Sequence, residues 1–130
     1  MGGEAVTCPS AHGDLDIYGA LSHSCNGVFA LLANELGGDT LASYAKKAGL
    51  TSSYSVDGIP TAAGRFDVAG ASANQLGWAG VGQYSDAVNP CALMVYMGAI
   101  ANGGKAAVPT LIQKVESPGL PSLPQFTRKT

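Results

Sequence analysis

The chain has 130 residues, which is enough for one domain or part of one, and its hydrophobic fraction of 46% is enough for a packed core. Only 12% of the residues are charged and the formal net charge is −2, so the sequence lacks the basic surface that nucleic-acid binding requires. It contains no apolar run long enough to span a membrane, and its first residues do not form the basic and apolar parts of a signal peptide.

Capping residues and apolar periodicity predict a mainly α structure. We expect helices near residues 15–22, 27–36, 40–48 and 90–102. A residue suited to the N-cap precedes each of them, namely Asp14, Asn26, Asp39 and Asn89. Glycines follow the second, third and fourth segments, where they favour the end of a helix.

Two of these helices have clear apolar stripes. In the second, the stripe has helical spacing and consists of Cys25, Val28, Phe29, Leu32 and Leu36. In the last, Pro90 occupies the first helical position, which favours a helix start. The stripe there is wide and consists of Leu93, Met94, Met97, Ile100 and Ala101. We therefore expect the last helix to be central to the fold.

The rest of the chain has little regular structure by pattern. Residues 50–77 show no sustained period, and several turn signals, among them Asp57-Gly58, interrupt them. A loop of that length is often functional in a compact domain. Residues 108–115 could form one extended strand, and residues 116–130 are predicted to be an irregular, proline-rich tail.

The segment between the first two predicted helices has polar side chains suited to chemistry. Ser24 and Asn26 are two residues apart, so in an extended or tightly turned backbone both side chains can point into one cavity. The helix that follows would hold them in place and leave free backbone N–H groups nearby. Judged on residue type alone, capping is the more common role for serine and asparagine.

The cysteine pattern argues against a metal centre. Three cysteines are present, and an odd number is not typical of a complete disulfide framework. Cys8, His12, His23 and Cys25 could be considered as a zinc set, but the spacing is poor and no C-x-x-C pair exists. We therefore expect no metal and no other cofactor.

Two segments resemble one enzyme family. Residues 20–30 resemble the Ser-x-Asn segment of penicillin-binding proteins, with Ser24 and Asn26 in the motif positions. Downstream, Gly80-Val81-Gly82-Gln83, Asn89-Pro90, Met94 and residues 99–104 resemble a second region of the class B D,D-transpeptidases. The resemblance implies that residues 1–115 are part of a transpeptidase domain. They would form the helical lobe of its β-lactamase/transpeptidase-like α+β fold, with the central β-sheet mostly missing.

The resemblance also implies a function for the complete protein. Such enzymes cross-link peptidoglycan stem peptides by serine acyl transfer and bind β-lactams, outside the cytoplasm and anchored to a membrane. Ser24 and Asn26 would then be catalytic, and Asn26, Gly82 and Gln83 would contact the substrate. Tyr84 departs from the family pattern, which has glycine after Gly82-Gln83. Cysteines are common in the family at the positions of Cys8 and Cys25, as free thiols or, in an exported protein, as a disulfide.

The other two motifs of the family are absent from the sequence. A Ser-x-x-Lys pattern at Ser43 and Lys46 lies after Ser24, whereas the family places the nucleophile before it. Lys129-Thr130 lacks the glycine of the third motif. We therefore expect the isolated chain to be inactive and to self-associate through surface that the missing sheet would cover. Two alternatives are a non-catalytic helical module that binds proteins and a small enzyme that uses Ser43 and Lys46.

Overall fold

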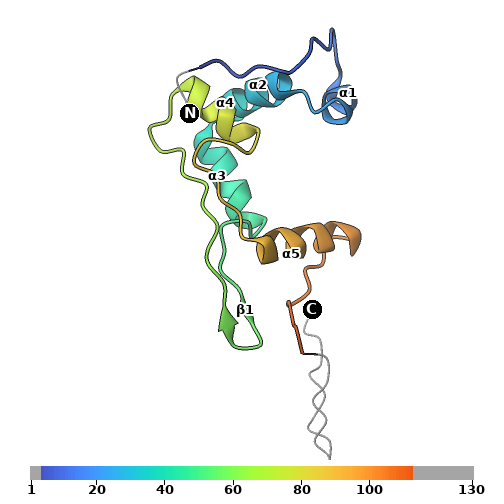
Figure 1. Ribbon diagram of the computed structural model, residues 1–130, viewed down its shortest axis with the longest axis vertical. Coiled ribbons are helices and arrows are strands. Elements are labelled where there is room, and N and C mark those ends of the chain that lie inside the picture. The colour runs from blue at the N-terminus through green and yellow to red at the C-terminus, as the bar shows by residue number, and fades with distance from the viewer. Residues whose placement is uncertain (1–3, 113–130) are drawn as a thin grey trace, which may run out of the picture. The chain divides into compact units, whose positions relative to one another are not determined.

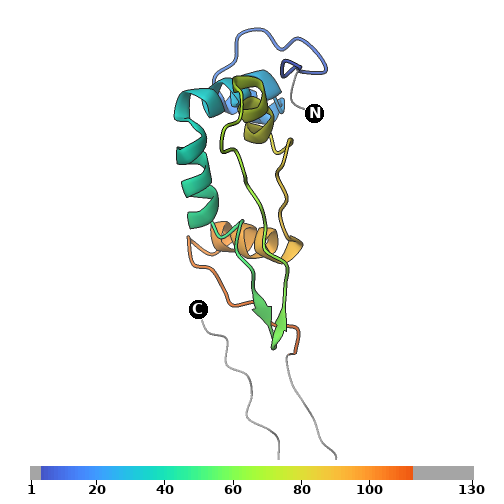
Figure 2. The same ribbon diagram turned by 90° about the vertical axis from the view of Figure 1, so that its left-hand side faces the viewer.

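A computed structural model of the protein describes residues 4–112 (Figures 1 and 2). Its elements in chain order are α1 (Ile17–Ser22), α2 (Asn26–Leu36), α3 (Gly38–Lys47), β1 (Ser55–Val56), β2 (Ile59–Pro60), α4 (Ala73–Gly80) and α5 (Pro90–Ala101). The prediction of a mainly α structure is confirmed. The chain forms two compact units, one of residues 4–47 with 65–87 and the other of residues 48–64 with 88–112. None of the helices in residues 4–112 is long and apolar enough to cross a membrane.

The first three helices lie where the sequence predicts them, with shifted starts. Asp16 caps α1 in place of Asp14, because its carboxylate accepts a hydrogen bond from the N–H of Gly19 at 2.7 Å. Helix α3 begins at Gly38, so Asp39 lies in its first turn rather than at the cap. A negative charge in that turn is favourable because the N-terminal end of a helix carries partial positive charge.

Helix α4 begins within residues 50–77, which the sequence pattern predicts to be a loop. Its N-terminus forms a capping box, in which the Ser72 hydroxyl accepts from the Gln75 N–H and the Gln75 side chain accepts from the Ser72 N–H. The box satisfies two backbone donors that the first turn would otherwise leave free. A recognisable start signal was therefore present in the sequence.

Helices α2 and α4 pack against each other through small residues (Figure 1). Ala30 and Ala33 are buried on α2, and Gly77 and Gly80 face them from α4. A Cβ atom added at Gly80 would overlap the Cβ of Ala33, and one added at Gly77 would lie 3.2 Å from the Cβ of Ala30. The buried face of α2 is thus centred on its alanines. Of the predicted stripe, Cys25 is buried, Val28, Phe29 and Leu32 are half-buried, and the last member, Leu36, is exposed.

The second unit contains a short antiparallel hairpin and α5. Asp57 and Gly58 join β1 to β2 with positive φ angles of 50° and 86°, the geometry of a type I′ turn. Helix α5 starts as predicted, since the Asn89 carboxamide oxygen accepts from the N–H groups of Cys91 (2.7 Å) and Ala92 (3.2 Å). The Asn89 amide donates to the hydroxyl of Thr61 at 2.7 Å, so the cap residue also contacts the segment that follows β2.

The expectation that α5 is central is wrong for the part of the chain that the structure describes. Ala92 is its one buried residue there. The large apolar side chains of the predicted stripe are 44–60% exposed, and these are Leu93, Met94, Met97 and Ile100. The cap, the proline at the first helical position and the apolar composition favour the helix, although no residue among 4–112 covers its wide apolar face.

The predicted strand at residues 108–115 is not present over residues 108–112, which form no β-ladder. The backbone N–H groups of Leu111 and Ile112 instead donate to the carboxylate of Asp57, at 2.6 and 2.8 Å. Residues 113–115 and the predicted tail at residues 116–130 lie outside the described residues.

Candidate active site

Ser24 lies in the tight turn between α1 and α2, and its side chain is exposed. Its N–H donates to the carbonyl of Leu21 at 3.1 Å, and the N–H of Cys25 donates to the carbonyl of Ala20 at 2.8 Å. These bonds hold Ser24 at a φ of 51°, in the left-handed region that residues other than glycine rarely adopt. Serine at such a position costs conformational energy, which the turn imposes.

Asn26 is the first residue of α2 and not its cap, so the predicted capping role is wrong. The N-cap is Cys25, whose side chain makes no capping hydrogen bond. The Asn26 amide donates instead to the backbone carbonyl of Thr7 at 3.0 Å. Neither Ser24 nor Asn26 therefore has the common structural role that its residue type suggests.

Gly82 and Gln83 follow α4 in a turn that α4 itself holds. The N–H of Gly82 donates to Ala79 at 3.0 Å, and the N–H of Gln83 donates to Trp78 at 2.9 Å. Tyr84 has a φ of 66°. The family's glycine would adopt this conformation without strain. Tyr84 keeps the turn, but its positive φ adds conformational strain that glycine would not have. Gln83 is exposed.

The segment after this turn pairs with residues 65–67. Arg65 and Ala87 exchange backbone hydrogen bonds of 2.6 and 2.9 Å, and the Arg65 Nε donates to the carbonyl of Ser85 at 2.9 Å. Asp86 lies between these contacts. Its Oδ1 atom is buried and lacks a hydrogen-bond partner among the described residues, and burial raises the pKa of its carboxyl to about 6.

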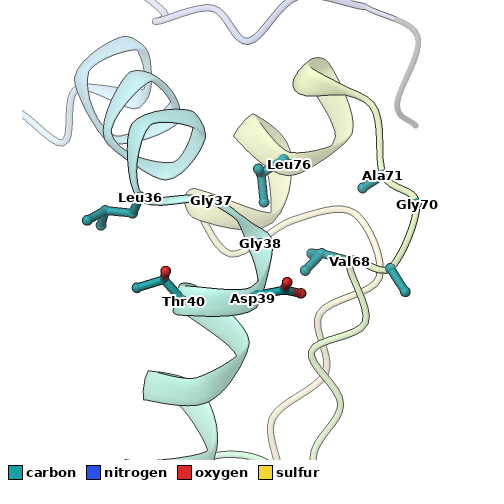
Figure 3. A pocket seen from close by; sticks show the side chains of 10 residues that line it. Leu36, Gly37, Gly38, Asp39, Thr40, Val68, Gly70, Ala71 and Leu76 are labelled. Carbon is teal, nitrogen blue, oxygen red and sulfur yellow. The ribbon is translucent and has the colours of Figure 1, made fainter.

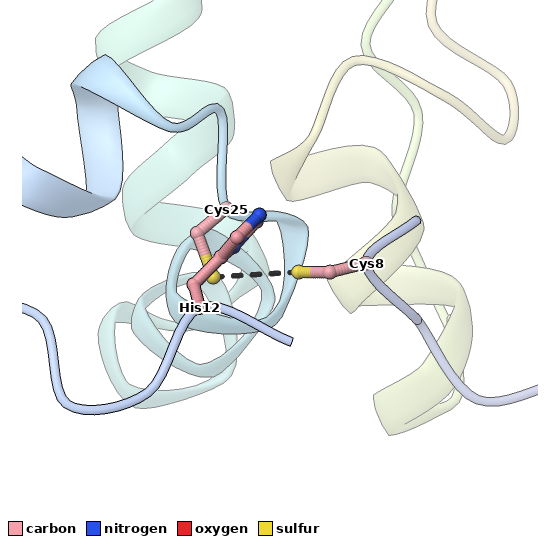
Figure 4. Close-up of side chains that lie close together, drawn as sticks. All are labelled: Cys8, His12 and Cys25. Atoms are coloured by element: carbon pink, nitrogen blue, oxygen red, sulfur yellow. Dashed lines mark hydrogen bonds between the residues drawn. The ribbon is translucent and has the colours of Figure 1, made fainter. Parts of the chain in front are cut away.

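The structure brings together three side chains that the sequence spacing does not favour as a cluster (Figure 4). The Cys8 and Cys25 sulfurs are 3.3 Å apart as free thiols, and the ligand atoms of Cys8, His12 and Cys25 all lie within 4.8 Å of one another. The His12 imidazole is the largest cause that lowers the pKa of Cys25 to about 7. Backbone N–H groups at the start of α2 and the Cys8 thiol lower it further. The sequence names these residues as a set but their spacing argues against it, because the connecting loop and not local spacing brings the three side chains together.

A cavity of about 400 Å³ lies elsewhere in the same unit, between the start of α3 and residues 68–71 (Figure 3). Leu36, Val68 and Leu76 give it apolar walls, and Asp39 and Thr40 give it polar ones. Ser24, Asn26, Gly82 and Gln83 do not line this cavity. It therefore does not belong to the predicted site.

The alternative nucleophile pair lies on α3. Ser43 and Lys46 are both exposed there, as expected for the solvent face of a helix. The neighbouring Lys47 ammonium lies 4.9 Å from the ring centre of Tyr44, so it is occupied by a cation–π contact. An exposed Ser43 lacks the enclosure of an acyl-transfer site within the described residues 4–112.

Comparison with known proteins identifies relatives of both sequence and fold. The family described as the penicillin binding protein transpeptidase domain matches residues 4–130. Penicillin-binding protein A from M. tuberculosis, as its imipenem acyl-enzyme complex, is 27% identical with a TM-score of 0.81 over 92% of this chain and 28% of that chain. Its ceftriaxone acyl-enzyme complex is 30% identical with a TM-score of 0.79 over 88% and 26% of the two chains.

A further crystal structure of that M. tuberculosis protein is 25% identical, with a TM-score of 0.80 over 95% of this chain and 32% of that chain. No curated protein sequence matches the chain. The chain thus spans 26–32% of the length of these solved structures.

Proposed function

Because the chain belongs to the family of penicillin-binding protein transpeptidase domains, we propose that it supplies the Ser-x-Asn part of a serine D,D-transpeptidase active site. The complete protein would cross-link peptidoglycan stem peptides by serine acyl transfer and be acylated by β-lactams. The M. tuberculosis structures are acyl-enzyme complexes with β-lactams, which supports the second activity. Stem peptides lie outside the cytoplasmic membrane, so the complete protein would act there, held by a membrane anchor.

The backbone of Ser24 is the observation that carries this proposal. A serine with a φ of 51° and an exposed hydroxyl is a strained position with no capping role. Such strain concentrates at functional sites, where the fold holds a side chain in a set direction. In the proposed mechanism the Ser24 hydroxyl passes a proton between the lysine of the nucleophile motif and the departing nitrogen. General acid–base groups of this kind contribute about 10²–10⁴-fold to rate.

Asn26 would bind the substrate backbone. A carboxamide has two N–H donors and one oxygen acceptor, and the bond to Thr7 uses one donor. The remaining N–H can donate to a substrate carbonyl, and the oxygen can accept from an N–H or from a lysine ammonium. The contact with Thr7 also fixes the amide plane, so the free groups are preorganised.

Gly82 and Gln83 are proposed as a second contact to the substrate. Gln83 is exposed and its backbone is fixed by the end of α4, which favours a side chain that is available for binding. Tyr84 replaces the glycine that follows Gln83 in the family motif.

The test uses a complete transpeptidase domain that contains this chain, acylated with a fluorescent penicillin. Ser24→Ala should lower the acylation rate about 10²–10⁴-fold with little change in melting temperature. Ser22→Ala is the matched control, because Ser22 is exposed and its hydroxyl only donates to the carbonyl of Gly19 at 3.1 Å. The 130-residue chain alone should form no adduct in intact-mass measurements.

Two results would contradict the proposal. Normal acylation by Ser24→Ala with a lowered melting temperature would give Ser24 a structural role only. A stable penicillin adduct on the isolated chain would mean that the chain itself contains the nucleophile, and Ser43 would be the first residue to examine.

A further inference from the structure

We propose that Asn102 is a site of spontaneous deamidation, in which its side-chain amide becomes an acid, and that the fold protects Asn26 from the same reaction. The sequence Asn-Gly occurs twice in the chain, at Asn26-Gly27 and at Asn102-Gly103. Glycine places no side chain beside the backbone nitrogen that follows the asparagine, so both pairs can cyclise in an unfolded chain. The local structure separates them in the folded chain.

The reaction needs only the asparagine, the glycine and water. The backbone nitrogen of the glycine loses its proton to solvent and attacks the Cγ atom of the asparagine, so that a new N–C bond closes a succinimide ring. The Cγ–Nδ2 bond breaks, and the amide nitrogen takes up a proton and leaves as ammonia. Water then opens the ring at either carbonyl, which gives aspartate or isoaspartate. Neither step involves an oxidant or a reductant.

Asn102 and Gly103 have the freedom that this reaction requires. Both residues are exposed and follow the last residue of α5, for which Asn102 is the C-cap. The N–H of Gly103 has no hydrogen-bond partner among the described residues, so the attacking nitrogen is not engaged. The side-chain amide of Asn102 makes one bond, to the carbonyl of Lys105 at 3.0 Å, which lies at the surface.

The backbone of this turn can also rearrange. Rotation about ψ of Asn102, which is 32°, must bring the glycine nitrogen onto Cγ. Gly103 and Gly104 have φ angles of 61° and 87°, and glycines change their backbone angles at low steric cost. The bonds that close the turn lie at an exposed helix end, where local opening requires little free energy.

Asn26 and Gly27 lack that freedom. They are the first two residues of α2, and helical geometry keeps the nitrogen of a residue away from the side chain of the residue before it. The N–H of Gly27 donates to the Cys8 sulfur at 3.3 Å, and the Asn26 amide donates to the Thr7 carbonyl at 3.0 Å. Cyclisation would break both bonds and open the start of α2. We therefore expect Asn26 to keep its amide in the folded chain.

The products would weaken the end of α5. Aspartate places a negative charge at the C-cap, where the carbonyls of the last turn already carry partial negative charge. A carboxylate has no N–H donor, so the bond to Lys105 is lost as well. Isoaspartate lengthens the main chain of the turn that the N–H of Gly104 closes on the carbonyl of Ala99 at 2.8 Å. None of this depends on the proposed function.

The experiment incubates the 130-residue chain in mildly alkaline buffer made with water that contains heavy oxygen. Each completed reaction incorporates one labelled oxygen atom, and peptide mapping by tandem mass spectrometry assigns it to a residue. Label should accumulate at Asn102 as aspartate and isoaspartate, whereas Asn26 should remain unlabelled. The same incubation in urea is the matched control, because both Asn-Gly pairs are then unfolded and should react at similar rates.

Three variants sharpen the experiment. Asn102→Gln should abolish labelling at this position, because glutamine would have to close a larger ring. Asn26→Gln removes the Asn-Gly pair of the other unit and should leave labelling at Asn102 unchanged. Asn102→Asp imitates one product and should melt at a lower temperature than the unaltered chain.

The proposal fails if Asn26 gains label as fast as Asn102 in the folded chain, or if Asn102 gains label only in urea. It also fails if Asn26 stays unlabelled in urea, since its protection would then not come from the fold. An Asn102→Asp variant as stable as the unaltered chain would contradict the effect on α5. Because acylation is not measured, failure here leaves the role of Ser24 open.

Discussion

Ser24 combines an exposed hydroxyl with a left-handed backbone. A residue other than glycine in that conformation costs on the order of 1–3 kcal/mol. The cost persists because the bonds from Ser24 to Leu21 and from Cys25 to Ala20 close the turn between two helices. Stability favours glycine at this position, whereas the proposed chemistry needs the serine hydroxyl. Substitution can separate the two effects.

Ser24→Gly should separate them. Glycine adopts positive φ freely, although it loses more chain entropy on folding, so the variant should be more stable by up to about 1 kcal/mol. Its acylation rate in a complete domain should fall as it does for Ser24→Ala, because the hydroxyl is gone. Thermal unfolding and penicillin acylation, measured on the same sample, test this. A variant of lowered stability would mean that the turn does not strain Ser24.

Asp86 makes stability depend on pH. Burial raises the pKa of its carboxyl from 3.8 to about 6, so the folded state holds the proton more tightly than the unfolded state. This contribution is fully present below about pH 4 and is lost as the pH rises through about 6. Asp86→Asn should remain neutral and gain stability relative to the unaltered chain between pH 4 and 7. Melting temperatures across that range test the sign.

A suitable control for this series is Glu35→Gln, which removes an exposed carboxyl from α2. It should not reproduce the change in pH dependence. If the two variants show the same profile, general surface charge rather than the burial of Asp86 sets the slope.

At the level of elements, α2 and α4 pack closely because the residues at their contact are small. Glycine in a helix costs about 1 kcal/mol relative to alanine, so Gly77 and Gly80 weaken α4 as an isolated helix. They are tolerated because they let the two backbones approach, with Ala30 and Ala33 filling the space between them. Packing thus decides the stability of α4 more than its intrinsic preference does.

Gly80→Ala should therefore destabilise the chain. The added methyl group would overlap the Cβ of Ala33, and overpacking of this kind costs about 1–3 kcal/mol. Gly98→Ala is the matched control, since a Cβ at Gly98 in α5 meets nothing within 4 Å. It should stabilise its helix by up to about 1 kcal/mol. Urea unfolding followed by circular dichroism distinguishes the two, and a neutral Gly80→Ala would mean that the helices can separate at little cost.

Helices with strong local signals were predictable from the sequence. Helix α5 has Asn89 and Pro90 at its start, and α2 has apolar residues at helical spacing and ends at Gly37, so the sequence predicts both helices. Helix α4 was missed although Ser72 and Gln75 form a capping box, because its buried face is made of glycine and alanine. Hydrophobic periodicity does not register a face of that kind.

The assignment of Ser24 and Asn26 to the site rests on the motif and stays a prediction. Their backbone roles could not be inferred from residue type. Asn26 is the first residue of α2 rather than its cap, and its amide donates to Thr7 from a distant segment. The convergence of Cys8 and His12 on Cys25 likewise depends on how the N-terminal segment returns to α2. Such contacts follow from tertiary structure, which spacing alone does not encode.

At the scale of the whole molecule, the chain is part of a larger fold. It spans 26–32% of the length of the matched M. tuberculosis structures, yet shares their backbone course with TM-scores near 0.8. The exposed apolar face of α5 has no partner among residues 4–112. In a complete domain such a face would be covered, and on a separate chain it favours association.

The isolated chain should accordingly form dimers or larger species through α5. Replacing Leu93 and Met97 together by glutamate should yield a monomer, because charge on this face opposes its burial. Leu21→Glu, at an exposed apolar position on α1, should leave the association unchanged. Light scattering over a range of concentrations tests this, and a monomer at high concentration of the unaltered chain would contradict it.

The contact between Trp78 and the N-terminal segment has an optical consequence. Trp78 is the only tryptophan in the sequence, and its indole N–H donates to the carbonyl of Glu4, 74 residues away, at 2.9 Å. Indole emission shifts in wavelength when the ring gains or loses contact with water. The segment that includes Glu4 and leads to Cys8 therefore has an intrinsic fluorophore on α4. Detachment of this segment from α4 can therefore be followed in real time by the wavelength of the Trp78 emission maximum, without any added label.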